Sequence, residues 1–129
     1  MDIKINEVLS EDKTGDDIQI KLEKAKKYEE NGKYKDAFQC YKDVAEFNNI
    51  EAICKLAYLY NKGLGVEKNE IEALSLYMKA SKLNSGEAQY NLGIMYRGGI
   101  ATIQNNEKAF YYFSKAAENG YIKDLVNVG

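Results

Sequence analysis

Apolar residues in the middle of the chain recur at the spacing of amphipathic helices. Ala52, Leu56 and Tyr60 stand four residues apart, and Ala73 and Tyr77 repeat the same interval. Residues at i, i+4 and i+8 lie on one side of an α-helix, whereas strand positions alternate every two residues. A glycine-containing segment, GLG, separates the two series and gives the backbone freedom to reverse direction. The pattern predicts two helices joined by a turn.

The whole helix-turn-helix pattern returns after 36 residues. The shift aligns residues of the same kind in one register, including Glu51 with Glu87, Ala52 with Ala88, Leu56 with Leu92, Tyr60 with Tyr96, Gly63 with Gly99, Ala73 with Ala109, Tyr77 with Phe113 and Ala80 with Ala116. A helical hairpin of this kind cannot cover its own apolar face, so neighbouring hairpins stack. The sequence therefore predicts an all-α fold: a short right-handed α-solenoid of about three helix-turn-helix repeats and a C-terminal partial repeat.

The repeats predict how the chain is divided. Residues 1–17 are expected to form an N-terminal arm or a short capping helix, and residues 18–129 the repeat domain. The repeats span about 18–49, 50–86 and 87–122, and a partial repeat follows at 123–129. The first repeat has a shorter turn, because Tyr28 and Ala37 stand nine residues apart where Tyr60 and Ala73 stand thirteen apart. Asn69 with Glu72 three residues later predicts a capping box at the start of a second helix.

The repeated motif resembles a known family. The pattern A-x3-L-[GA]-x2-Y-x2-G-x-G, followed by A-x3-[YF]-x-K-A-[AS], occurs in 52–81 and 88–117 and is similar to Sel-1-like repeats, relatives of tetratricopeptide repeats. The resemblance implies a scaffold that holds a peptide or protein on its concave face, which the first helix of each repeat lines. Ala101 and Thr102 replace the second glycine and the valine of the motif, so we expect a different turn there.

The resemblance also implies which residues face the groove. Carried over position by position, they include Leu22, Glu30, Glu51 and Glu87. The candidate partner-binding residues are Lys26, Glu29, Cys54, Tyr58, Asn61, Lys62, Tyr90, Ile94 and Arg97. Aromatic side chains and arginine commonly anchor protein interfaces, which favours a binding strip. The alternative is that Cys54, Tyr58, Tyr90 and Ile94 only pack one first helix against the next.

Composition excludes several classes of function. The chain has no His, which removes the commonest general base and the commonest metal ligand, so we expect no catalytic site, no metal and no cofactor. Its 18 basic and 20 acidic residues form no basic cluster, which argues against nucleic acid as a partner. Two cysteines are too few for a secreted disulfide scaffold, and no apolar stretch reaches the length of a membrane span. We expect a cytoplasmic protein without membrane association.

These considerations predict a non-enzymatic protein-protein interaction module with a peptide or protein partner on its concave face. A finer hypothesis is a bacterial immunity protein that neutralises a cognate toxin. The alternative is a structural self-assembly unit, or a fragment of a longer scaffold, that docks through an uncapped C-terminal edge. Residues 122–129 would form this edge, because Ile122, Leu125 and Val126 begin another apolar series.

Overall fold

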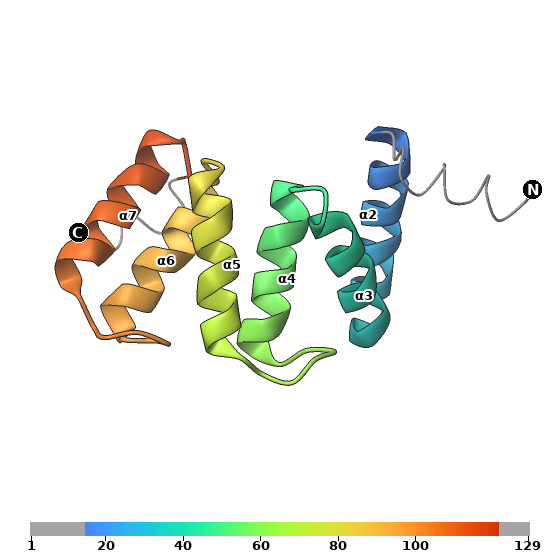
Figure 1. The fold of residues 1–129 in the computed structure, drawn as a ribbon, viewed down its shortest axis with the longest axis horizontal. Coiled ribbons are helices and arrows are strands. Elements are labelled where there is room, and N and C mark those ends of the chain that lie inside the picture. The colour runs from blue at the N-terminus through green and yellow to red at the C-terminus, as the bar shows by residue number, and fades with distance from the viewer. Residues whose placement is uncertain (1–14, 122–129) are drawn as a thin grey trace, which may run out of the picture.

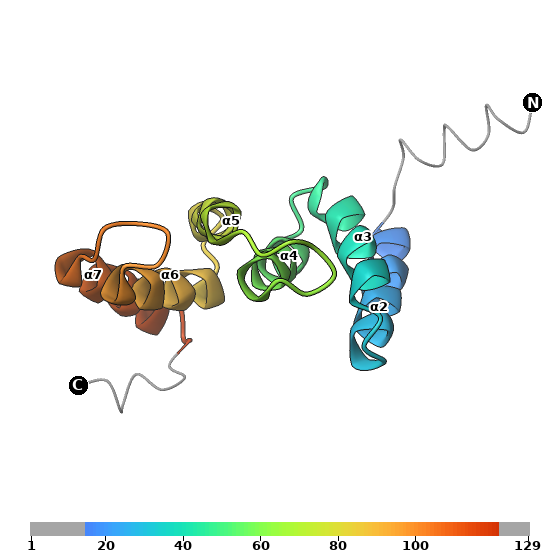
Figure 2. The ribbon, with the colours of Figure 1, turned by 90° about the horizontal axis from the view of Figure 1, so that it is seen from below.

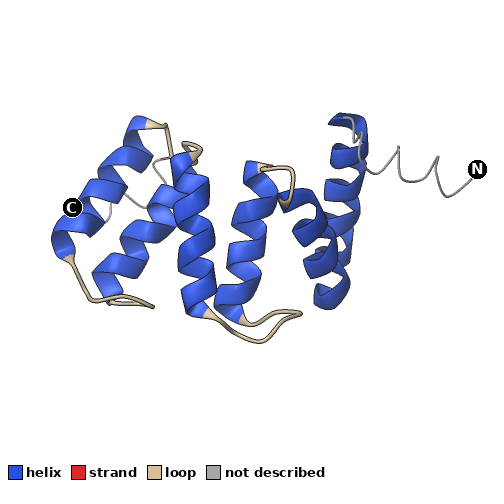
Figure 3. Cartoon of the chain, in the orientation of Figure 1, coloured by secondary structure: helices blue, strands red, loops and turns tan. Residues whose placement is uncertain are grey.

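Six α-helices form the part of the chain that the computed structural model describes, residues 15–121, which contains no strand (Figure 3). Their bounds are α2 (Gly15–Glu30), α3 (Tyr34–Ala45), α4 (Ile50–Lys62), α5 (Glu70–Lys82), α6 (Gly86–Gly98) and α7 (Asn106–Glu118). The predicted all-α class is therefore confirmed. Most of the predicted arm at 1–17 and the predicted edge at 122–129 lie outside the described residues.

The helices pack in the order of the sequence, each against the next (Figure 1). The hairpins are α2–α3, α4–α5 and α6–α7, and α3–α4 and α5–α6 form the interfaces between them. Seen from below, the hairpins follow one another along the long axis of the molecule (Figure 2). This arrangement is the stacked repeat scaffold that the 36-residue period predicts.

Small residues alternate with large ones in the core, which lets the helices approach closely. Each of the six described helices carries a fully buried alanine, among them Ala25, Ala37 and Ala57. Gly93 serves the same purpose on α6, because a Cβ there would lie 2.7 Å from the ring of Phe113. Larger side chains fill the space between the helices, and the largest fully buried ones are Tyr41, Leu22, Ile53, Leu59, Leu92, Gln89 and Cys54.

Polar side chains cap four of the helices at their N-termini. Asn49, Asn69, Ser85 and Asn105 each accept a hydrogen bond from a backbone N–H three residues on. The predicted cap at Asn69 is thus confirmed, at 2.9 Å to the N–H of Glu72. The reciprocal half of the capping box is not formed, because the Asn69 N–H donates instead to the carbonyl of Tyr60 at 2.9 Å.

The turn between α6 and α7 corrects the expectation of a different conformation there. Gly63 and Gly65 in the preceding repeat have φ values of 70° and 74°, and Gly99 and Ala101 have 67° and 62°. The loss of the glycine therefore leaves the turn unchanged. Ala101 adopts the left-handed conformation, which costs a residue with a Cβ about 1–2 kcal/mol.

We expect Ala101→Gly to stabilise the protein by about 1 kcal/mol, because glycine adopts this φ without strain but loses more entropy on folding. The midpoint of urea unfolding would measure the change. Ala117→Gly is the matched control, since Ala117 is exposed within α7 and the same replacement there should destabilise by about 0.5–1 kcal/mol. A loss of stability in both variants would contradict the strain assigned to Ala101.

Candidate functional site

A hollow of about 330 Å³ lies where α2, α4 and α6, the first helices of the three hairpins, face the same side. We call it the concave hollow. Tyrosines and charged groups predominate in its lining, and α5 and the residue after α7 also contribute to it. Its residues are Glu29, Lys55, Tyr58, Tyr77, Glu87, Tyr90, Asn91 and Tyr121.

Three of the predicted binding residues meet in the concave hollow. Glu29 comes from α2, Tyr58 from α4 and Tyr90 from α6, so all three first helices supply one. Tyr58 is 39 % exposed and is the most accessible large aromatic of α4. The ring of Tyr90 packs against Tyr121 at 5.5 Å and against Phe113 at 5.6 Å. Tyr90 therefore contributes to packing as well as to the surface.

Four other predicted residues do not line the concave hollow. Lys26 forms an ion pair with Glu51 of α4 at 2.8 Å, so its charge is already compensated. Asn61 is half-buried and Lys62 is exposed, both in the last turn of α4. The guanidinium of Arg97 lies over the ring of Phe113 at 5.4 Å, in the geometry of a cation–π contact. Arg97 and Lys62 remain available to a partner that extends beyond the hollow.

The structure corrects the placement of two groove-facing residues and qualifies a third. Cys54 is 1 % exposed and Leu22 is 2 % exposed, so neither can contact a partner on this face. Ile94 is half-buried and packs against the core. α4 and α6 each pack against their own second helix and against the second helix of the preceding hairpin, so their buried faces are wider than one stripe of every fourth residue. For Cys54 the alternative of helix packing is therefore correct.

The Cys54 thiol lies against the cap of the next hairpin, with its Sγ 3.4 Å from the Oγ of Ser85. Burial raises the pKa of this thiol to about 11, while the contact with Ser85 acts in the opposite direction. Cys40 is also a buried free thiol, and burial raises its pKa as well. Both cysteines are therefore protonated at neutral pH, and a buried protonated thiol is a poor nucleophile.

The raised pKa of Cys54 makes stability depend on pH in a defined window. The folded state holds the thiol proton more tightly than the unfolded chain, whose value is 9.0. This contribution is fully present below pH 9 and is lost as the pH rises to about 11, by about 2 kcal/mol. Unfolding free energies of wild type and Cys54→Ala, measured across this range, should diverge in slope. Parallel curves would contradict the assignment.

Charges are unevenly compensated around the concave hollow. The carboxylate of Glu29 accepts a hydrogen bond from the Tyr41 hydroxyl at 2.8 Å and lies 3.7 Å from the Nζ of Lys55. Within residues 15–121 the carboxylate of Glu87 has no ion pair, since only its backbone carbonyl is engaged, by the side-chain amide of Asn91 at 2.9 Å. The α6 side of the hollow is therefore acidic.

Sequence reasoning missed the role of Tyr77. Its spacing places it in the packing stripe of α5, and it is indeed 2 % exposed, yet its side chain also lines the hollow. Burial is the main cause that raises the pKa of its hydroxyl, and neighbouring Cys54 and Glu87 raise it further. The sequence held one indication of this role. Residues 41, 77 and 113 are equivalent positions of the three repeats, and Tyr41 and Tyr77 carry a hydroxyl there, whereas Phe113 does not.

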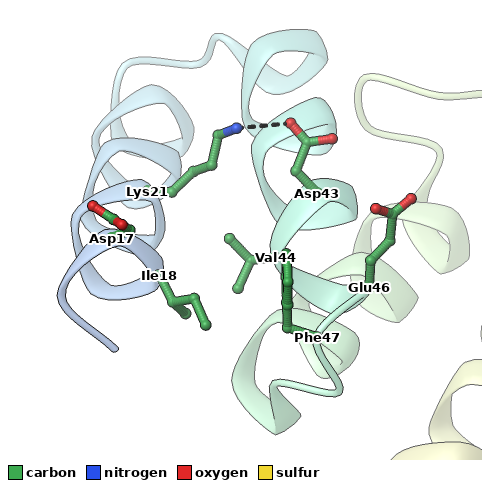
Figure 4. Close-up of a pocket in the computed structure, with 7 residues that line it drawn as sticks. All are labelled: Asp17, Ile18, Lys21, Asp43, Val44, Glu46 and Phe47. Carbon is green, nitrogen blue, oxygen red and sulfur yellow. Dashed lines mark hydrogen bonds and ion pairs between the residues drawn. The ribbon is translucent and has the colours of Figure 1, made fainter. Parts of the chain in front are cut away.

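A second, smaller hollow of about 220 Å³ lies between α2 and the end of α3 (Figure 4). The side chain of Lys21 bridges to Asp43 at 3.0 Å across it, and the ring of Phe47 forms part of its wall. Its only lysine is therefore engaged by a neighbouring carboxylate. None of the residues predicted to bind a partner lies in this hollow.

Two negative findings limit the chemistry of residues 15–121. They contain no group of three or more His, Cys, Asp or Glu side chains able to hold a metal ion. None of the six described helices is both long enough and apolar enough to cross a membrane.

The Sel1 repeat model matches residues 50–85 and 86–121, together more than half of the chain. The chain belongs to the Sel1 repeat family. The two matched segments are the hairpins α4–α5 and α6–α7, and the first hairpin lies outside the match. Sel1 repeats generally form non-catalytic scaffolds that mediate protein-protein interactions. A search of curated protein sequences gave no match.

Solved structures of Sel1 repeat proteins resemble this chain. A Sel1 repeat protein from Oxalobacter formigenes is 35 % identical over 67 % of the chain, with a TM-score of 0.63. A protective antigen of uropathogenic Escherichia coli is 30 % identical over 74 % (TM-score 0.63), and cysteine-rich protein B of Helicobacter pylori is 28 % identical over 65 % (TM-score 0.62). The matches span 35 %, 22 % and 63 % of those proteins, respectively.

Proposed function

We propose that this chain is a non-enzymatic interaction module that binds a peptide or protein partner in the concave hollow. The observation that carries the proposal is the convergence of Glu29, Tyr58 and Tyr90, from three different helices, on one hollow. Tyrosine buries a large area at a low cost in side-chain entropy and keeps a polar hydroxyl, which suits it to anchor a partner. The protein-binding use of Sel1 repeats in general supports the same function.

Affinity capture from a lysate of the source cell tests this proposal. Wild type, Tyr58→Ala and Ile71→Ala would be used in parallel, and retained proteins identified by mass spectrometry. Ile71 is an exposed apolar residue of α5 that does not line the hollow, so it controls for the loss of any surface hydrophobic group. We expect a partner that wild type and Ile71→Ala retain and Tyr58→Ala loses. Equal retention by all three would contradict the proposal.

The finer proposal is that the partner is a toxin and the chain its immunity protein. Its support is the concave hollow itself, since such a protein acts by covering a surface of the toxin. The two buried free thiols support the cytoplasm as its compartment. A toxin among the Tyr58-dependent partners should lose toxicity when the chain is produced with it. Undiminished toxicity would exclude the immunity role and leave the interaction module in place.

A specific observation favours self-assembly as the second candidate. Phe110 of α7 is 74 % exposed, and its neighbour Tyr111 is also exposed, as is Ile103 in the turn before α7. Phe38, two repeat periods earlier, packs edge-to-face against Tyr60 of the following helix at 5.3 Å. Phe110 has no corresponding helix among the described residues, so this face of α7 could receive one from a second copy.

Sedimentation equilibrium separates this candidate from the main proposal. If α7 mediates assembly, the mass of the wild type should rise with concentration, and Phe110→Ser or removal of residues 122–129 should abolish the rise. Tyr58→Ala should behave as wild type, because Tyr58 lies on another face. A monomer at every concentration would exclude the self-assembly unit.

A further inference from the structure

An unpartnered hydroxyl lies at the floor of the concave hollow. Tyr77 is 2 % exposed, lines the hollow, and forms no hydrogen bond through its hydroxyl with any residue of 15–121. One repeat earlier, the hydroxyl of Tyr41 donates to the carboxylate of Glu29 at 2.8 Å. Among the described residues only Nε2 of Gln89 is a fully enclosed side-chain atom without a partner, so the Tyr77 hydroxyl opens onto the hollow, where water or a ligand can reach it. The Tyr77 hydroxyl is thus placed to bond with a group that enters the hollow.

The carboxylate of Glu87, which has no counter-ion within residues 15–121, lines the same hollow as Tyr77. Glu87, at the start of α6, lines the hollow and has no ion pair within residues 15–121, whereas Lys55 lies 3.7 Å from Glu29. The carboxylate of Glu87 is close enough to Tyr77 to raise the pKa of its hydroxyl, after burial and Cys54. The Tyr77 hydroxyl and the Glu87 carboxylate can therefore contact the same group bound in the hollow.

Tyrosine rings form the walls around these two groups. Tyr58 of α4 is partly exposed, and Tyr90 of α6 packs against Tyr121 at 5.5 Å with their ring planes at 54°. The faces of aromatic rings carry negative electrostatic potential, so they attract a cation held within about 6 Å. A lining that contains three tyrosine rings and the exposed carboxylate of Glu87 is complementary to positive charge.

We infer that the concave hollow receives a lysine or arginine side chain of the partner, between the rings of Tyr58, Tyr90 and Tyr121 and against Glu87. The inference rests on the proposed function and names the chemistry by which the partner is recognised. The ammonium or guanidinium group forms an ion pair with Glu87, and its stem packs along the rings. One of its N–H groups donates to the Tyr77 hydroxyl in place of water.

Other side chains fit the hollow less well. An acidic side chain would face Glu87 and Glu29, and the one cation of the lining, Lys55, is already close to Glu29. An apolar side chain would remove water from the Glu87 carboxylate and the Tyr77 hydroxyl without replacing its hydrogen bonds, which is unfavourable. Charge complementarity therefore selects a cation.

Selection from a phage-displayed random peptide library on the immobilised full chain tests the inference. Clones that bind wild type and lose binding on Tyr58→Ala would be sequenced, and the corresponding peptides synthesised. Calorimetric titrations would then compare wild type, Glu87→Gln and Glu118→Gln. Glu118 lies at the exposed end of α7 and serves as the matched charge control. Tyr77→Phe removes the floor hydroxyl alone, and Phe113 shows that phenylalanine fits the equivalent position.

We expect the Tyr58-dependent peptides to share a lysine or arginine, and replacement of this residue by norleucine to weaken binding at least tenfold. Glu87→Gln should weaken the parent peptide by about the same factor and have little effect on the norleucine peptide, whereas Glu118→Gln should change neither. Tyr77→Phe should weaken the parent peptide a few-fold.

Two results would overturn the inference in distinguishable ways. Tyr58-dependent peptides without a shared cation, or with acidic or apolar residues in its place, would refute the cation assignment and leave the interaction module standing. So would unchanged affinity in Glu87→Gln. The absence of any Tyr58-dependent peptide would count against both the cation assignment and the concave hollow as a binding site.

Discussion

Gly65→Ala is expected to destabilise the protein by about 4 kcal/mol. Gly65 lies in the turn between α4 and α5, and a Cβ there would lie 2.3 Å from the carbonyl carbon and oxygen of Tyr34 at the start of α3. Backbone atoms cannot move aside as a flexible side chain can, so the turn and α3 would have to separate. The overpacking adds to the cost of a positive φ of 74°. Thermal and urea unfolding would measure the loss.

Gly32→Ala is the matched control for this prediction. Gly32 has nearly the same φ, 73°, but nothing lies within 4 Å of the position of its Cβ. Only the backbone strain applies, so we expect a loss of about 1 kcal/mol. Ala101, which replaces glycine at the position equivalent to Gly65, shows that the turn itself tolerates a Cβ. Equal losses in Gly65→Ala and Gly32→Ala would mean that the contact with α3 is absent in solution.

Leu92→Ala is expected to cost about 3 kcal/mol of unfolding free energy. Leu92 is fully buried on α6, and deletion of its side chain removes apolar contacts and leaves a cavity. Leu92→Met keeps most of the volume and should cost less than about 1.5 kcal/mol. Tyr58→Ala, on a partly exposed side chain, should cost less than Leu92→Ala while it removes binding. Similar destabilisation by Leu92→Ala and Tyr58→Ala would contradict the assignment of buried and accessible faces of the first helices.

The repeat period made much of the fold predictable. Residues 36 positions apart occupy equivalent places in their hairpins, so the helices, the cap at Asn69 and the glycine turn followed from comparison of the chain with itself. The turn at Ala101 was wrongly expected to differ, because residue preference suggested a change where packing of the hairpin imposed the same φ. Tertiary packing can thus hold a residue in a conformation that its local preference opposes.

The candidate site was less predictable than the fold. Spacing identified the face that carries Glu29, Tyr58 and Tyr90. It also included Cys54, which is buried and lies against Ser85 of the following hairpin. The i, i+4 spacing of apolar residues along one helix does not show how many other helices pack against it. Tyr77 was missed for a related reason, since a residue of the packing stripe can still turn its polar end toward a hollow formed by other helices.

Site-specific photo-crosslinking tests whether the concave hollow binds a partner in the cell. p-Azidophenylalanine, which keeps an aromatic ring, would replace Tyr58 in the concave hollow or Phe110 on the exposed face of α7, and the source cells would be irradiated. We expect a crosslink to another protein from position 58 and none to that protein from position 110. Crosslinks from position 110 alone, or from position 58 only to a second copy of the chain, would contradict the claim that the concave hollow binds a partner.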